Sequence, residues 1–233
     1  MQAFKSLLFP VKAIPSMVVL FMFRIKLHEE NVAEVLQHSV NMLNNGGIVS
    51  YPTETFYGLG VKFDREDSLQ KLYEIKQRSD DKALPIIIGS RDSLSQIVSS
   101  VNDKAVSLMN RFWPGPLTLI LRAKKSLSSY ITAGTHSVAV RIPGESFALR
   151  LAQYAGFPIT ATSANPSGKT PAHDAETVLQ YFGNRIDLII DGGVTKGTLP
   201  STIVDVRGEN IEIVREGAIK RELIHTHNNR TQK

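Results

Sequence analysis

The order of apolar patterns along the chain restricts its fold more than any other feature of the sequence. Short apolar runs typical of buried strands alternate with segments of helical periodicity, and strand-like runs follow one another near the end. Alternating strands and helices favour parallel pairing, whereas neighbouring strands favour antiparallel pairing. With 233 residues, 42% of them hydrophobic, the chain is large enough for one domain with a sizeable core. The sequence therefore predicts an α/β domain with a mixed sheet and flanking helices.

The individual elements follow from periodicity and from the residues that end them. Val32, Val35 and Leu36 begin an apolar helical stripe that Gly46 and Gly47 end. Helices are expected over residues 29–45, 67–77, 92–98, 102–112, 146–156 and 175–183. Strands are expected over residues 48–51, 84–89, 117–121, 137–143, 158–163, 186–193, 201–206 and 211–216.

The two ends of the chain differ from the regular pattern between them. Residues 1–24 contain no acidic residue, and their apolar run is too short to cross a bilayer. We expect a poorly ordered N-terminal extension over 1–24, one folded domain over 25–220 and a polar tail over 221–233. A targeting peptide and translation from Met17 or Met22 are both open explanations of the extension, and no membrane association is expected.

Composition and missing motifs exclude several classes of function. The chain has no cysteine, so it has no disulfide framework, no thiol nucleophile and no cysteine-based zinc site, which favours a reducing, cytoplasmic setting. It contains neither a G-x-x-x-x-G-K-[ST] loop nor a G-x-G-x-x-G, H-E-x-x-H or G-x-S-x-G motif. The net charge of +5 suits anionic partners such as nucleotides or RNA, although the basic residues are spread along the chain.

Polar side chains share one face of a predicted strand. In SVAVRIP, alternation puts Ser137, Ala139 and Arg141 on one face and apolar residues on the other. The apolar face belongs in the core, and the small alanine leaves room for a ligand between the hydroxyl and the guanidinium. A solvated sheet face explains this strand equally well.

Two further segments carry groups suited to phosphate. KQRSDDK places Lys76, Arg78 and Lys82 around the end of a predicted helix, where they fit either a polyphosphate clamp or the helix dipole. TATSANPSG offers hydroxyls, an amide and closely approachable backbone after a strand, although these residue types are also common in turns.

Six motifs occur together and in order: PTETFYGLG, KQRSDDKALP, WPGPLT, VAVRIP, SANPSG and STIVD. They resemble the YrdC-like family of threonylcarbamoyl-adenylate synthases in its short, single-domain form, and the resemblance covers residues 30–219. It implies a single twisted α/β domain, catalytic in function, with a large basic concave face.

The resemblance also implies a reaction. L-threonine, bicarbonate and ATP, accompanied by Mg²⁺, would give threonylcarbamoyl-adenylate and pyrophosphate. A tRNA threonylcarbamoyl-transferase complex would then pass the threonylcarbamoyl group to the adenosine just 3′ of the tRNA anticodon. A direct contact between this chain and RNA stays open.

Site residues follow from the matching motif positions. Threonine is expected to contact Thr55, Arg141, Ala161 and Ser201. ATP is expected to contact Arg78, Lys82, Ser137, Ser163, Asn165 and Arg215. Lys76 and Arg78 are expected to act in catalysis, with Lys76 on the same basic face as the phosphate-binding residues. Arg141 is expected to hold the threonine carboxylate as a two-point fork.

The chain departs from longer relatives in one threonine contact. Those relatives have a histidine in the strand after the basic motif, where this chain has isoleucine near Ile87. Glu54 lies in the first motif but is expected to support the site or to be solvated, so no general base is assigned. The alternative function is a non-catalytic module that binds double-stranded RNA or tRNA through the same basic concave face.

Overall fold

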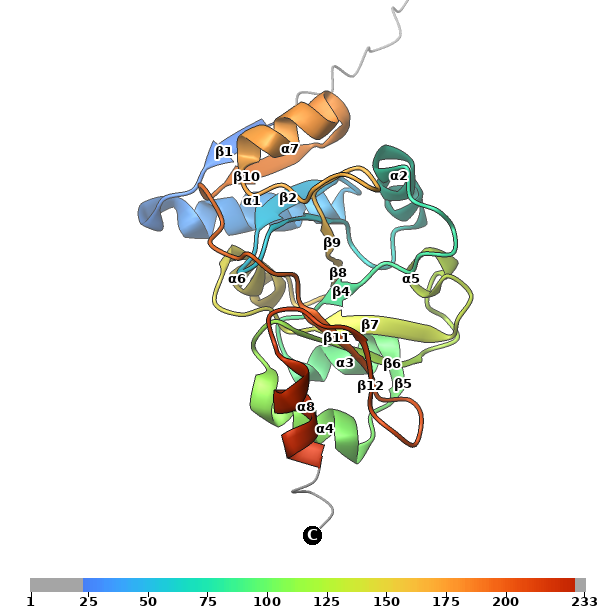
Figure 1. Ribbon diagram of the computed structural model, residues 1–233. Helices are drawn as coiled ribbons and strands as arrows, with labels where there is room; N and C mark the ends of the chain where they lie inside the picture. Colours follow the sequence, from blue (N-terminus) through green and yellow to red (C-terminus); the bar gives the residue numbers. More distant parts are fainter. Residues whose placement is uncertain (1–22, 229–233) are drawn as a thin grey trace, which may run out of the picture.

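The computed structural model describes residues 23–228, with side chains described up to Ile224. Its strands form two sheets, one above the other in Figure 1. The strands are β1 (Phe23–Lys26), β2 (Val49–Pro52), β3 (Tyr57–Gly60), β4 (Ile86–Ile87), β5 (Val98–Ser100), β6 (Leu117–Ala123), β7 (Ser137–Arg141), β8 (Ile159–Thr160), β9 (Thr162–Ser163), β10 (Leu188–Asp191), β11 (Thr202–Asp205) and β12 (Glu212–Arg215).

Helices flank both sheets. They are α1 (Val32–Asn44), α2 (Glu66–Lys76), α3 (Leu94–Ile97), α4 (Asp103–Phe112), α5 (Ser129–Thr132), α6 (Phe147–Ala155), α7 (Ala175–Phe182) and α8 (Arg221–Asn228), with 3₁₀ turns η1 (Glu29–Asn31), η2 (Arg91–Ser93) and η3 (Gly183–Arg185). In Figure 1, α1 and α7 lie with the upper sheet, and α3, α4 and α8 lie with the lower one.

The two sheets mix parallel and antiparallel pairs, as the sequence predicts. Sheet A has the order β1-β10-β2-β3-β9, in which the first three strands are parallel and β3 and β9 are antiparallel to their neighbours. Sheet B has the order β12-β11-β6-β7-β4-β8, with β5 paired to β6. The parallel pair β11–β6 and the antiparallel pair β6–β7 lie side by side in it.

The chain crosses from one sheet to the other at Ala161. The sequence predicts one strand over 158–163, but Ile159–Thr160 pairs with β4 in sheet B, and Thr162–Ser163 pairs with β3 in sheet A. The amide of Ala161 donates to the carbonyl of Pro85, 2.8 Å away. A straight strand cannot belong to two sheets of different direction, so the pairing changes at this residue.

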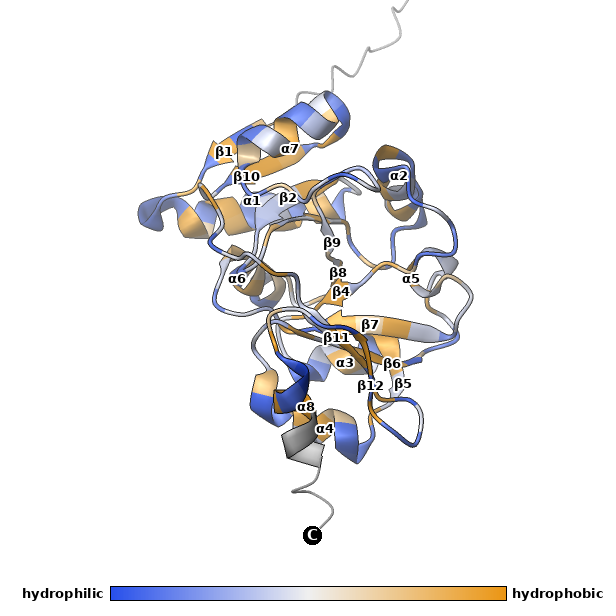
Figure 2. Ribbon diagram, viewed as in Figure 1, coloured by the Kyte–Doolittle hydropathy of each residue, from blue (hydrophilic) through white to orange (hydrophobic). Residues whose placement is uncertain are grey.

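Apolar residues fill the interior between the helices and the sheets. Figure 2 shows hydrophobic colour along the strands and hydrophilic colour on the outer sides of α1, α2 and α4. On α1, Val35, Leu36 and Leu43 are buried and the helix packs against α6. The apolar stripe predicted for this helix therefore packs into the core.

The end of the chain differs from the polar tail expected over 221–233. Arg221–Asn228 form α8, which packs near α4, and Ile224 is completely buried in the core. Leu223 and Ile224 are the only apolar residues between positions 221 and 233, and one adjacent pair gives little periodic signal, which is why the sequence predicts no helix there.

The start of the described chain also corrects the expectation for residues 1–24. Phe23–Lys26 form β1, which pairs in parallel with β10 at the edge of sheet A. The rest of the expected extension lies outside the described residues. Within residues 23–228, every helix is too short or too polar to span a membrane.

Candidate active site

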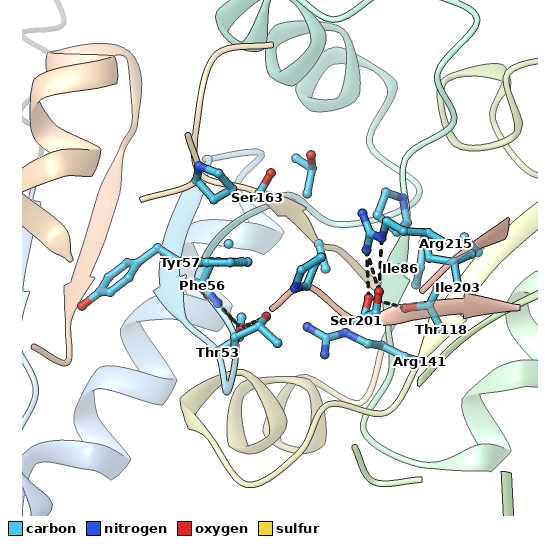
Figure 3. Close-up of a pocket in the computed structure, with 18 of the residues that line it drawn as sticks. Thr53, Phe56, Tyr57, Ile86, Thr118, Arg141, Ser163, Ser201, Ile203 and Arg215 are labelled. Carbon is cyan, nitrogen blue, oxygen red and sulfur yellow. Dashed lines mark hydrogen bonds between the residues drawn. The ribbon is translucent and has the colours of Figure 1, made fainter. Parts of the chain in front are cut away.

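A cavity of about 530 Å³ lies where the two sheets meet. Sheet A contributes Tyr57, Gly58 and β9, and sheet B contributes residues of β4, β6, β7 and β11. A volume of this size falls in the range of sites that bind cofactors and drug-sized ligands, roughly 300–1,000 Å³. Figure 3 shows Arg141 and Arg215 on either side of Ser201, opposite Ser163 and Phe56.

The loop between β2 and β3 forms one wall and is held by its own hydroxyl. Thr53 Oγ1 accepts hydrogen bonds from the amides of Thr55 and Phe56, at 3.0 and 3.2 Å, and donates to the carbonyl of Phe56 at 2.7 Å. Its oxygen also lies 2.9 Å from Thr55 Oγ1. This hydrogen-bonded turn fixes the loop, so Thr55 lines the cavity in a defined position.

Three arginines make the cavity cationic. Arg78, Arg141 and Arg215 line it, and none of the described residues that line it is acidic. Burial, together with the charge of Arg141, lowers the pKa of Arg215. Like charges held this close favour an anionic ligand that relieves their repulsion.

Arg78 is fixed by the turn that follows α2. Gln77 ends the helix in the left-handed conformation, with φ of 50°. Arg78 Nε donates to the carbonyl of Lys82 at 2.8 Å, and Nη2 donates to that of Ala83 at 2.6 Å. The guanidinium thus holds its own loop closed while it lines the cavity. Burial lowers the pKa of Arg78.

Two hydroxyls meet at the opposite wall. Ser201 Oγ lies 2.9 Å from Thr118 Oγ1, and Arg215 Nη2 donates to the carbonyl of Ser201 at 2.9 Å. Thr118 is not among the predicted site residues, although alternation along WPGPLTLIL places it on the face opposite Leu117 and Leu119. A polar residue within an otherwise apolar strand is the sequence signal that could have indicated Thr118 as a cavity residue.

Lys76 does not lie where the sequence predicts it, on the basic face with the phosphate-binding residues. It is only 2% exposed and does not line the cavity. Its Nζ donates to the carbonyls of Ser163 and Asn165, at 2.5 and 2.6 Å, beneath the loop that follows β9. Burial and the charge of Arg78 lower the pKa of Lys76 to about 7. Lys76 therefore holds the backbone of this loop.

Three other predicted contacts also lie away from the cavity. Asn165 Nδ2 donates to the carbonyls of Pro166 and Lys169, and Ser137 Oγ lies 2.7 Å from Thr135 Oγ1. Lys82 is exposed. The structure brings together Thr55, Arg78, Arg141, Ala161, Ser163, Ser201 and Arg215. Their ligand-binding roles stay predictions.

The strand that lacks the histidine of longer relatives presents a different residue to the cavity. Ile86 borders the cavity, and both Ile86 and Ile87 are completely buried. Ile87 pairs with Arg141 along the sheet. Among the described residues that line the cavity, none is a histidine.

The described side chains provide no metal-binding cluster at the site. Residues 23–224 hold no group of three or more histidine or acidic side chains arranged to bind a metal ion. With no carboxylate lining the cavity, the side chains do not fit a resident Mg²⁺ ion. Mg²⁺ is therefore expected only as the ion that accompanies ATP.

The segment that leads into β11 packs tightly on the threonine-rich loop. A Cβ atom at Gly197 would lie 2.4 Å from Thr55 Cα and 2.5 Å from Thr55 O. Gly197→Ala should therefore displace the loop and lower the free energy of unfolding by about 1–3 kcal/mol. Denaturant unfolding checks this. Gly208→Ala is the control, since a Cβ there meets nothing nearer than 3.9 Å, and equal losses in both variants would contradict the prediction.

Comparison with known proteins agrees with this geometry. Residues 41–217 match the family Sua5_yciO_yrdC, described as "Telomere recombination". The Threonylcarbamoyl-AMP synthase of Bacillus subtilis (strain 168) is 40% identical over 184 residues, 78% of this chain and 53% of the relative. That of Pyrococcus abyssi (strain GE5 / Orsay) is 37% identical over 186 residues, 80% of this chain and 55% of the relative. This chain thus spans about half the length of these two relatives.

A solved structure is similar over most of the chain. The crystal structure of P. abyssi Sua5 complexed with L-threonine has a TM-score of 0.83 and 34% sequence identity. The match covers 89% of this chain and 60% of that one.

Proposed function

Because the chain belongs to the Sua5/YciO/YrdC family, we propose that it is an L-threonylcarbamoyladenylate synthase. The reaction joins L-threonine, bicarbonate and ATP into threonylcarbamoyl-AMP and releases pyrophosphate and water. The product would serve the threonylcarbamoyladenosine modification of tRNA, through a separate transferase complex, in the cytoplasm.

One observation carries the proposal: residues suited to an amino acid and residues suited to a nucleotide line a single cavity. Arg141, Thr118 and Ser201 supply a guanidinium and two hydroxyls on sheet B. Arg78 and Ser163 face the same space from the turn after α2 and from β9. Threonine and the α-phosphate of ATP would therefore meet at the junction of the sheets.

The side chains suggest how the reactants are held. Arg141 would bind the threonine carboxylate, and the pair Thr118–Ser201 would hydrogen-bond its hydroxyl, so an amino acid without that hydroxyl would leave polar groups unpaired. Arg78 would stabilise negative charge that develops at the α-phosphate while the carbamate oxygen of carboxylated threonine attacks and pyrophosphate leaves.

No group of the chain needs to take a proton in that step. Once the amine has reacted with bicarbonate, the attacking atom is an anionic carbamate oxygen. Holding it in line with the departing pyrophosphate can supply roughly 7–11 kcal/mol of the barrier. The structure agrees with such a role, because hydrogen bonds within the chain fix both Arg78 and the loop of Thr55.

A pyrophosphate-release assay tests the proposal. Purified protein with ATP, Mg²⁺, bicarbonate and L-threonine should release pyrophosphate, and omission of threonine or bicarbonate should slow release by at least about 10-fold, a barrier difference of roughly 1.4 kcal/mol or more. Equal ATP turnover without threonine would contradict the proposal. Binding of duplex RNA without pyrophosphate release would instead support the non-catalytic RNA-binding module.

A further inference from the structure

Arg141 is held by a carboxylate of the protein itself. Its Nη1 pairs with Glu54 Oε1, and only 10% of the arginine side chain and 16% of the glutamate side chain are exposed. Arg141 lines the cavity from β7, whereas Glu54 belongs to the loop between β2 and β3 and does not line it. The ion pair therefore ties the loop of sheet A to a strand of sheet B.

The contact uses only part of the guanidinium. Arginine and carboxylate commonly form two parallel hydrogen bonds, but here a single nitrogen pairs with a single oxygen. Within the described part of the chain, the other nitrogens of Arg141 make no hydrogen bond and no second ion pair. Glu54 Oε2 is buried and also lacks a hydrogen-bond partner there. The pair thus leaves donors of Arg141 available to a ligand in the cavity.

Glu54 is itself firmly placed. The hydroxyl of Thr53 closes the turn around it by accepting from the amides of Thr55 and Phe56. Gly144 packs against its side chain so closely that a Cβ atom there would lie 3.2 Å from Glu54 Cγ. A carboxylate fixed in this way can fix the guanidinium that it binds.

Arg141 needs such a restraint because a second cation is near. Arg215 lines the same cavity, and the charge of Arg141 contributes to lowering the pKa of Arg215. Without a hydrogen-bond acceptor for Arg141 Nη1 at position 54, repulsion would turn the two guanidinium groups away from each other, and Arg141 would no longer point into the cavity.

We propose that Glu54 is a positioning residue for amino-acid binding. By holding one nitrogen of Arg141, it directs the remaining N–H groups of the guanidinium towards the carboxylate of the amino-acid substrate. The identity of that substrate rests on the proposed function, but the orientation of Arg141 does not.

Two substitutions of similar size separate hydrogen bonding from charge. Glu54→Gln keeps an oxygen that accepts from Arg141 Nη1, so its Kd for L-threonine should stay within about 3-fold of wild type. Glu54→Leu removes the acceptor and should raise that Kd by at least about 10-fold. Calorimetric titration with L-threonine measures both.

Kinetics supply a second readout. In Glu54→Leu, the KM for threonine should rise, while the KM for ATP and the kcat at saturating threonine change by less than about 3-fold. Glu176→Leu is the matched control, since Glu176 pairs with Arg24 on the surface and is 58% exposed. Equal increases in the KM for threonine and for ATP, or an unchanged Kd, would overturn the proposal.

A crystal structure of Glu54→Leu tests the orientation without any ligand or activity. The Arg141 guanidinium should be displaced, and an unchanged orientation would overturn the proposal. If wild-type protein neither binds threonine nor releases pyrophosphate, the proposed function fails, yet this readout still decides the role of Glu54. If Glu54→Leu does not fold, Glu54→Asp replaces it, because its shorter side chain withdraws the carboxylate from Arg141 and should also raise the Kd.

Discussion

Arg141→Ala should raise the KM for L-threonine by about 100-fold, because truncating one partner of a buried charged pair costs roughly 2–5 kcal/mol. The guanidinium lines the cavity, and its only described ion pair uses one nitrogen, so the remaining donors are available to the substrate carboxylate. The KM for ATP should change far less. Steady-state kinetics with each substrate varied in turn measure the difference.

Lys82→Ala is the comparison, because Lys82 is exposed and does not line the cavity. Its KM for threonine should stay near the wild-type value. A larger effect on threonine from Lys82→Ala than from Arg141→Ala would mean that the division of the cavity into amino-acid and nucleotide walls is wrong.

Loss of Arg141 also leaves Glu54 buried without its partner, so the alanine variant should lose stability as well. Arg141→Lys separates the two effects, since it keeps the charge but cannot form the planar fork. It should stay folded in thermal denaturation while its KM for threonine still rises by about 10-fold, the loss of one charge-assisted hydrogen bond.

Lys76→Met should lower the free energy of unfolding by about 2–4 kcal/mol and reduce activity. The substitution leaves the buried carbonyls of Ser163 and Asn165 without a donor, at roughly 1–3 kcal/mol each, less what is recovered by no longer burying an amine. The loop that carries Ser163 should then loosen. Denaturant unfolding measures the stability, and pyrophosphate release measures the consequence for the site.

The stability that Lys76→Met loses should depend on pH, and the direction of that dependence follows from the pKa of Lys76. The folded-state pKa of Lys76 is about 7, and its ordinary value is 10.5. Between these values the unfolded chain binds more protons, so Lys76 makes the wild-type protein more stable as the pH rises, by up to about 1.4 kcal/mol per pH unit. The stability gap between wild type and Lys76→Met should therefore widen from pH 7 towards pH 10. A neutral amine still has two N–H donors, one for each carbonyl.

Lys71→Met provides the control for Lys76→Met. Lys71 is exposed on the same helix, so its loss should change the free energy of unfolding little at any pH. A gap that narrows as the pH rises, or an equal loss in both variants, would contradict a structural role for the buried amine.

Sequence periodicity predicts most helices and strands because it reports which face of an element meets the core. The extent of short strands is different: strands are expected over 84–89 and 158–163, but β4 and β8 within them contain two residues each, because pairing with neighbouring strands sets their ends rather than local pattern. The break at Ala161 is invisible in PITATS for the same reason, since nothing in the local sequence says that its halves pair with different sheets.

Motif order predicts most of the cavity wall but not the direction of each side chain. Arg78, Arg141 and Ser201 line the cavity as expected, because strand ends and turns present them there. Lys76 and Asn165 turn inward instead. The direction of Lys76 depends on carbonyl groups of a loop nearly ninety positions away, and spacing within a motif carries no information about such partners. Asn165 instead hydrogen-bonds to carbonyls of its own loop, those of Pro166 and Lys169.

The junction of the two sheets at Ala161 affects how a bound ligand stabilises the protein. A ligand bound to both Arg141 and Ser163 contacts sheet B and sheet A at the same time, on either side of the junction between them. Unfolding either sheet would then release it. A ligand that contains both an amino-acid part and a nucleotide part would therefore make the two halves lose their structure together, whereas a ligand confined to one wall would protect only that half.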